Sequence, residues 1–193
     1  TTENVVYFDN ITFGAGTPPP SPLTAAPTPT VPAANVISLF SDAYTNVTVN
    51  TWRTDWSNAV FAEVDIQGNK TIKYSALDVV GVETVGANQI NATDMMYVHF
   101  DMWSADATTF RIKIVDFGAD GAYGGGDDKE HEYVITDPAK ETWNSKAILL
   151  SDLTGLTTRA HISQIIFSAL PTGKNTVYLD NIFFSKGGGA SVN

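Results

Sequence analysis

Two neighbouring stretches of this chain alternate apolar and polar side chains, and this period of two is the feature that most restricts its fold. They span residues 97–103 and 109–115. Further stretches that predict strands are 61–66, 71–76, 131–135, 147–150, 162–168 and 176–184. No stretch carries a sustained helical stripe. Many short strands separated by Gly, Asn and Asp clusters predict an all-β domain, a β-sandwich or jelly roll.

The composition narrows the class of ligand. Lys and Arg number 11 against 21 Asp and Glu, and the net charge of -10 argues against nucleic acid and anionic membranes. A neutral ligand or bound cations agree with it. No apolar run approaches the roughly 20 residues needed to span a bilayer, so we expect no membrane insertion. The absence of cysteine excludes a disulfide framework, a thiolate zinc site and a cysteine nucleophile.

Two similar segments near the ends of the chain predict tandem modules. The pattern V-Y-[FL]-D-N-I-x-F occurs at 6–13 and again at 177–184. We interpret residues 1–13 as the last strand of an upstream copy. Two alternatives are that the similarity arose by chance, or that this first strand docks on the module itself. The chain is then an excised piece of a larger protein, expected at the outer cell surface or outside the cell.

A proline-rich stretch separates the two segments. Seven of the nine prolines fall between positions 18 and 32, and this stretch is predicted to be extended and to hold two modules roughly 45 Å apart. The predicted linker as a whole spans residues 14–34. The module proper is predicted at 35–186. The glycine-rich residues 187–193 are predicted to begin a downstream linker.

Alternation also places side chains on faces. Val98, Phe100 and Met102 share the core side, together with Phe110, Ile112 and Ile114 if the two alternating strands pair. The outer side then carries His99, Asp101, Trp103, Arg111 and Lys113. A Trp ring can cover the apolar face of a pyranose while polar groups meet its hydroxyls. The alternative is a solvated face with cross-strand ion pairs.

A second constellation is Trp52-Arg53-Thr54-Asp55-Trp56. Two tryptophans in a polar stretch are costly to expose, so they either pack over the sandwich edge or form a stacking platform. Trp143 is interpreted as structural.

The acidic, glycine-rich stretch 116–132 joins two predicted strands. Asp116, Asp120 and Gly121 match an EF-hand loop weakly, because Gly118 replaces the second acid. Such a long loop is typically functional or mobile. It is predicted either to contact ligand, through Tyr123, Asp127, Asp128 and His131, or to hold calcium.

Catalysis finds little support in the sequence. The motif E-x-D-x-x-E of one class of jelly-roll glycoside hydrolases begins at Glu63 and Asp65, but position 68 is Gly68. The pair of carboxylates that glycoside hydrolysis needs is therefore incomplete. The three histidines are too scattered for a metal motif. We expect a protein that is not an enzyme, with a polysaccharide lyase or glycoside hydrolase as the minor alternative.

Several segments together resemble a carbohydrate-binding module: 36–44, 51–57, 99–103, 115–121, 124–128, 160–168 and 177–182. Such modules accompany laminarinase-type glycoside hydrolases and surface glycan-binding proteins of marine Bacteroidetes-type bacteria. The resemblance implies a jelly roll of two antiparallel sheets that binds polysaccharide without catalysis. It also implies a structural calcium ion between the first and last strands, carried over here to Asp42 and Asp180.

These observations lead to one hypothesis and a competitor. The hypothesis is a monomeric module that binds a β-glucan of the laminarin (β-1,3) type and is covalently linked to neighbouring modules or an enzyme. The residues expected to contact glycan are Trp52, Arg53, Trp56, His99, Asp101, Trp103, Arg111 and Tyr123. The competing hypothesis is a structural or adhesion module, a calcium-bound spacer.

Overall fold

The computed structural model describes residues 20–187, which form nine strands and two three-residue 3-10 turns. The predicted strand at 1–13 lies outside these residues, as do residues 14–19 of the predicted linker 14–34 and all of the predicted linker 187–193 except Gly187. The strands are β1 (Val36–Phe40), β2 (Asn58–Ile66), β3 (Asn69–Glu83), β4 (Tyr97–Ser104), β5 (Thr109–Asp116), β6 (Lys129–Thr136), β7 (Asn144–Leu149), β8 (Ile162–Leu170) and β9 (Asn175–Ser185). Within this part of the chain no helix is long and apolar enough to cross a membrane.

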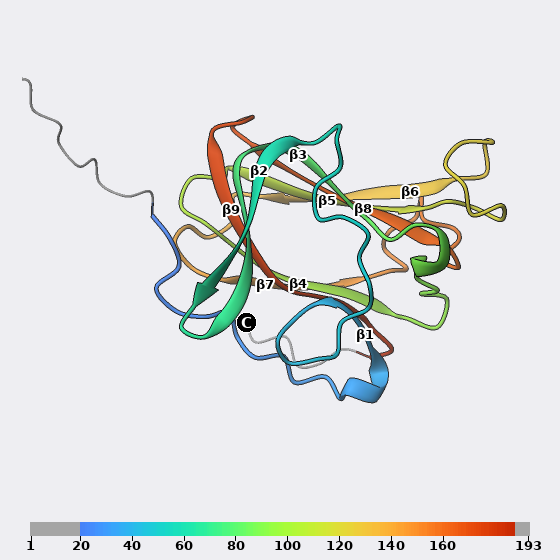
Figure 1. Ribbon diagram of the computed structural model, residues 1–193, viewed down its shortest axis with the longest axis horizontal. Coiled ribbons are helices and arrows are strands. Elements are labelled where there is room, and N and C mark those ends of the chain that lie inside the picture. The colour runs from blue at the N-terminus through green and yellow to red at the C-terminus, as the bar shows by residue number, and fades with distance from the viewer. Residues whose placement is uncertain (1–19, 188–193) are drawn as a thin grey trace, which may run out of the picture.

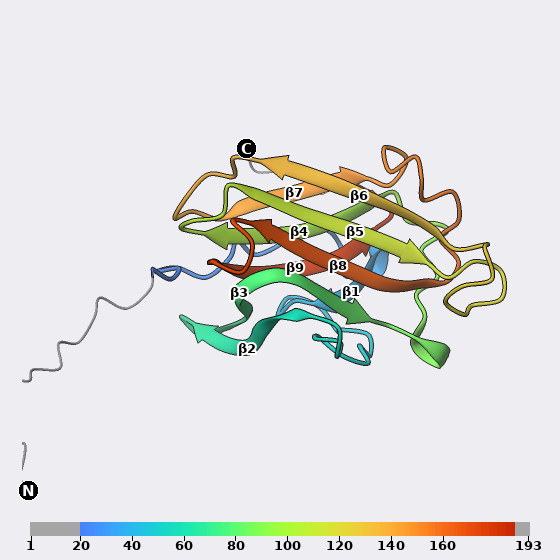
Figure 2. The same cartoon turned by 90° about the horizontal axis from the view of Figure 1, so that it is seen from above.

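The strands pair in the order β6-β5-β8-β3-β9-β4-β7, with β1 added on β9 and β2 on β3. All these pairs are antiparallel. The long strand β3 is shared, since its first half pairs with β9 and Val79–Glu83 pairs with β8. The order therefore folds at β3 into two layers, with β5, β6 and β8 in one and β4, β7 and β9 in the other (Figures 1 and 2). This confirms the predicted all-β sandwich.

The passage of β3 between layers has a local cause. Ala76 has a φ of +50°, and the pairing of β3 with β9 shifts register between Ser75 and Leu77. An extra residue of this kind bends a strand and increases its twist. The strand predicted at 71–76 would end at Ala76, whereas β3 continues to Glu83 in the second layer.

Side chains on the inner faces of both layers fill the core. The predicted core residues of β4 and β5 are all buried, and the rings of Phe100 and Phe110 lie 5.8 Å apart. They meet across the sandwich and not along one sheet, because β4 pairs with β7 and β9 while β5 pairs with β6 and β8. The two alternating strands therefore do not pair, and their outward side chains belong to opposite surfaces of the molecule.

Candidate functional site

The outer face of β6-β5-β8-β3 is an open surface that combines an aromatic ring with hydrogen-bonding groups. We call it the platform face. These four strands follow one another in this order in Figure 2. Its members are Trp56, Gly81, Glu83, Arg111, Lys113, Glu130, Glu132, Gln164 and Ile166.

Trp56 supplies the aromatic ring of the platform face. A Cβ at Gly81 would overlap the ring, so the indole lies directly over the glycine backbone. The ring remains 49% exposed. An indole against the sheet on one side and open to solvent on the other is suited to stacking on a sugar ring.

Hydrogen bonds fix the loop that carries Trp56. Thr54 donates its backbone N–H to the Gly81 carbonyl at 3.1 Å, and Gly81 donates its N–H to Ser57 Oγ at 3.0 Å. Arg53 spans the loop, donating from Nε to the Ala59 carbonyl at 2.8 Å and from Nη2 to the Ser57 carbonyl at 3.1 Å. Arg53, predicted to contact sugar, therefore contacts the loop backbone and positions Trp56.

A row of residues crosses the four strands from Trp56. Gly81 lies opposite Ile166, Ile166 opposite Lys113, and Lys113 opposite Glu132. Three strand spacings of about 4.8 Å make this row about 14 Å long. The row thus begins with an apolar section beside Trp56 and ends in charged groups, over a length that suits a few sugar units of a chain.

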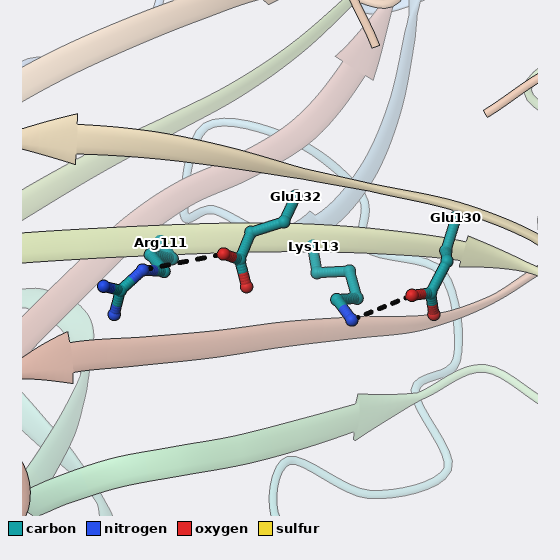
Figure 3. A network of polar contacts seen from close by, with 4 residues as sticks. All are labelled: Arg111, Lys113, Glu130 and Glu132. Atoms are coloured by element: carbon teal, nitrogen blue, oxygen red, sulfur yellow. Dashed lines mark hydrogen bonds and ion pairs between the residues drawn. The ribbon is translucent and has the colours of Figure 1, made fainter. Parts of the chain in front are cut away.

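Four charged groups of the platform face form two ion pairs (Figure 3). Arg111 Nε lies 3.5 Å from Glu132 Oε1, and Lys113 Nζ lies 2.9 Å from Glu130 Oε1. Both pairs are partly exposed, so they contribute little to folding stability. Their charges cancel, and they offer donors and acceptors to hydroxyl groups without a net positive patch. A neutral ligand fits this surface better than a polyanion.

The other outer face, on β4, β7 and β9, is covered. Residues 20–32, which we call the strap, lie against it, with Pro22, Ala26 and Val31 buried. Beneath the strap, His99, Asp101 and Trp103 are all buried, although their side chains point away from the core. His99 stacks on Phe183 at 4.3 Å, and burial lowers its pKa to about 4.

The structure therefore separates the residues predicted to bind sugar. Trp56 and Arg111 share the platform face, while His99, Asp101 and Trp103 lie under the strap on the opposite side. Trp52 packs on the core, with its ring 5.5 Å from that of Phe40. Tyr123 is 78% exposed on the loop after β5 and packs on Phe117.

Several members of the platform face were absent from the predicted set. Gly81, Glu83, Gln164 and Ile166 enter it because β8 lies between β5 and β3, and Glu130 and Glu132 enter it because β6 pairs with β5. Gln164 donates from Nε2 to Glu83 Oε1 at 2.9 Å, which links those two strands on this face. The alternation within 162–168 is visible in the sequence, but the neighbours of β8 are far away along the chain.

The two residues predicted to hold calcium lie in one region. Asp180 is fully buried and accepts hydrogen bonds from the Asn69 side chain and from the Asn181 N–H. The pKa of Asp180 is raised to about 7, mainly by burial and to a smaller extent by the carboxylates of Asp101 and Asp42. Asp42, Asn69 and Asn181 line one pocket together with residues 26–29 of the strap.

A buried carboxylate beside other carboxylates is what a bound cation would stabilise. Among residues 20–187, however, no three His, Cys, Asp or Glu side chains converge as a metal cluster. Calcium at this place would draw its remaining ligands from amide and carbonyl oxygens, such as those of Asn69 and Asn181.

The acidic loop after β5 uses its carboxylates mainly to hold its own shape. Asp116 is buried and accepts from Gly118 N–H, Thr158 Oγ1 and His161 N–H. Asp127 accepts from Ala119 N–H at 2.7 Å, which lowers its pKa. These contacts account for Asp116 and Asp127 without a metal ion.

Glu63 and Asp65, the beginning of the hydrolase-like motif, have structural partners. Glu63 pairs with Lys70 at 3.3 Å, and Asp65 accepts from Gly68 N–H at the turn between β2 and β3. Gly68 has a φ of +83°. This position therefore favours glycine for the turn, where the motif would place its final glutamate.

Comparison with solved structures identifies the fold. The chain is similar to a family 30 carbohydrate-binding module, with a TM-score of 0.59 and 15% identity over 82% of this chain and 91% of that one. It is also similar to the family 30 module of the cellulosomal cellulase Cel9D-Cel44B of Clostridium thermocellum (TM-score 0.58, 15% identity, 80% and 99% covered). For the family 11 module of the cellulase Lic26A-Cel5E of the same organism the TM-score is 0.54, with 18% identity over 79% and 95%.

No protein-family model matches the chain, and no curated protein matches it. At these identities the structural similarity establishes the fold alone. The chain has the β-sandwich fold of a carbohydrate-binding module. All three structural neighbours are carbohydrate-binding modules, and two of them belong to cellulosomal cellulases.

Proposed function

We propose that this chain is a non-catalytic module that binds a neutral β-glucan across the platform face. The observation that carries the proposal is the half-exposed Trp56 ring lying over Gly81, at one end of a row of hydrogen-bonding groups. One sugar unit stacks on Trp56. The following units extend over Ile166 toward Lys113 and Glu132, where hydroxyls exchange hydrogen bonds with the paired charges.

The laminarin-type β-1,3-glucan is the first ligand to test, and localisation outside the cell next to an attached enzyme is part of the proposal. Such a module raises the local concentration of substrate around its enzyme. Two solved structures with this fold are modules of cellulosomal cellulases, and this supports the proposed place next to an enzyme.

Calorimetry against laminarin, mixed-linkage β-glucan, cello-oligosaccharides and mannan tests the proposal, with calcium present. Trp56→Ala should weaken binding by at least roughly 30-fold, as expected for loss of a central aromatic anchor. Tyr123→Ala is the matched control, because it removes a more exposed aromatic ring elsewhere. Absence of binding to every neutral glucan, or loss of binding in Tyr123→Ala alone, would overturn the proposal.

We further propose that calcium binds at Asp42 and Asp180, as a structural ion that supplies positive charge to the buried carboxylate. The support is the burial of Asp180, its raised pKa and the position of Asp42 on the adjoining pocket. The ion is remote from the platform face in this proposal and takes no part in binding sugar.

A further inference from the structure

The strap is bound to the sandwich through its backbone carbonyls. Trp143 donates from Nε1 to the Thr24 carbonyl at 2.9 Å, Asn181 from Nδ2 to the Pro27 carbonyl at 2.9 Å, and Tyr44 from its hydroxyl to the Val31 carbonyl at 2.8 Å. The strap is the blue segment that precedes β1 in Figure 1. Each of these bonds joins a side chain of the sandwich to an acceptor of the strap.

This pattern matches the chemistry of an extended, proline-rich peptide. Residues 25–30 carry neither helix nor strand, so their carbonyls need partners from outside. Pro27 and Pro29 lack N–H groups, so these two positions need no acceptor from the sandwich. The bound carbonyls of Thr24 and Pro27 are three positions apart, the repeat of a polyproline II helix, and that of Val31 follows four positions later.

The three donors come from separate elements of the fold. Tyr44 follows β1, Trp143 precedes β7, and Asn181 lies in β9 at a residue with a φ of +50°. Asn181 is itself oriented, since its Oδ1 accepts from Ser41 Oγ at 2.7 Å while its Nδ2 also donates to Asp101 Oδ2 at 2.6 Å. The sandwich thus presents these donors together only after it has folded.

Aromatic side chains complete the surface. His99 stacked on Phe183 lies under residues 27–31, and Trp103 and Trp143 line a pocket with residues 20–24. Aromatic-lined grooves with side-chain donors recognise polyproline II segments at low entropic cost, because such segments are already extended.

We propose that the outer face of β4, β7 and β9 is a recognition surface for a proline-rich extended peptide, and that its occupant is this chain's own strap. The strap is an intramolecular ligand and not a free spacer. Of the predicted linker 14–34, six residues (14–19) then remain to separate the module from what precedes it, a reach of at most about 20 Å. An upstream module is held near the Trp143 edge, well short of the roughly 45 Å expected for an undocked linker.

A competition experiment on the full chain tests this proposal. Ala26→Asp with Val31→Asp places charges at two buried strap positions and should release the strap. A synthetic peptide of residues 20–34 should then bind this variant in calorimetry. It should not bind the wild type, where the tethered strap has a far higher effective concentration. Adding Trp143→Phe to the released variant should lower its affinity for the peptide about 3- to 10-fold, because one hydrogen-bond donor is removed. Adding Trp56→Phe should leave this affinity unchanged.

A second measurement covers the case in which the released variant fails to fold. The chain has no cysteine, so spin labels at Thr28→Cys and Thr136→Cys report one distance. A narrow distribution supports the docked strap, and a broad one, as for a free linker, overturns the proposal. A correctly folded released variant that does not bind the peptide overturns it as well.

Discussion

The Trp56 ring occupies the space that a side chain at Gly81 would fill. The sheet therefore accepts the indole only because position 81 lacks a Cβ. This contact makes Gly81 a determinant of the platform face, although glycine has no side chain that could contact a ligand.

Gly81→Ala should displace the Trp56 ring. We expect a loss of about 1–3 kcal/mol in the free energy of unfolding, the usual cost of overpacking, together with weaker glucan binding. A double-mutant cycle in urea denaturation checks the cause, because the cost should largely disappear in the Trp56→Ala background. An equal cost of Gly81→Ala in both backgrounds would mean that the two residues do not interact.

Neutralising the cross-strand pairs should affect binding more than stability. For Lys113→Met and for Glu130→Gln we expect changes below about 1 kcal/mol in unfolding free energy, since these pairs are partly exposed. Glucan affinity should fall in both variants. Lys70→Met, which breaks the exposed pair with Glu63 on β2 and β3, is the matched control and should leave affinity unchanged.

Lowering the pH should destabilise the wild type, because His99 is protonated more readily in the unfolded chain than in the folded one. Burial lowers the pKa of this imidazole from 6.5 to about 4, so between these values the unfolded chain binds a proton that the folded chain does not. Stability contributed by neutral His99 is thus present above pH 6.5 and is lost as the pH falls toward 4.

His99→Gln removes this titration. Between pH 7 and pH 4 the wild type should lose about 2–3 kcal/mol more than the variant in chemical denaturation. The raised pKa of Asp180 acts in the opposite direction but is common to both proteins, and so it cancels in the comparison. Parallel profiles for the two proteins would show that the imidazole is not buried in its neutral form.

Calcium should raise the melting temperature of the wild type, and EDTA should reverse the effect. Asp180→Asn should abolish the response. In EDTA at pH 8 the variant should be at least as stable as the wild type, because it buries no charge. Asp127→Asn serves as the control for the acidic loop. A calcium response that persists in Asp180→Asn but disappears in Asp127→Asn would place the ion in that loop.

The sequence predicts local features of this fold well. Alternation in 97–103 and 109–115 identifies β4 and β5 and their inward side chains, because period two is a property of each strand alone. The layer to which each strand belongs depends on partners far away in the chain. The consecutive strands β4 and β5 lie in opposite layers, and so Trp103 and Arg111 do not share a surface.

The proline content of the strap likewise predicts its local conformation but not its contacts with the sandwich. Prolines between positions 18 and 32 predict a segment without helix or ladder, as observed for residues 25–30, but they do not reveal docking. That depends on Tyr44, Trp143 and Asn181, which are dispersed along the sequence. The boundary of the upstream module stays a prediction.

The four tryptophans give the most direct test of the proposed binding face, because each indole N–H yields a separate signal in a ¹⁵N–¹H spectrum. During titration with a laminarin oligosaccharide, we expect the Trp56 signal to shift in proportion to saturation. The signals of Trp52 in the core and of Trp103 and Trp143 near the strap should remain in place. If the Trp103 or Trp143 signal moved while the Trp56 signal stayed in place, the proposal that glucan binds to the platform face would be contradicted.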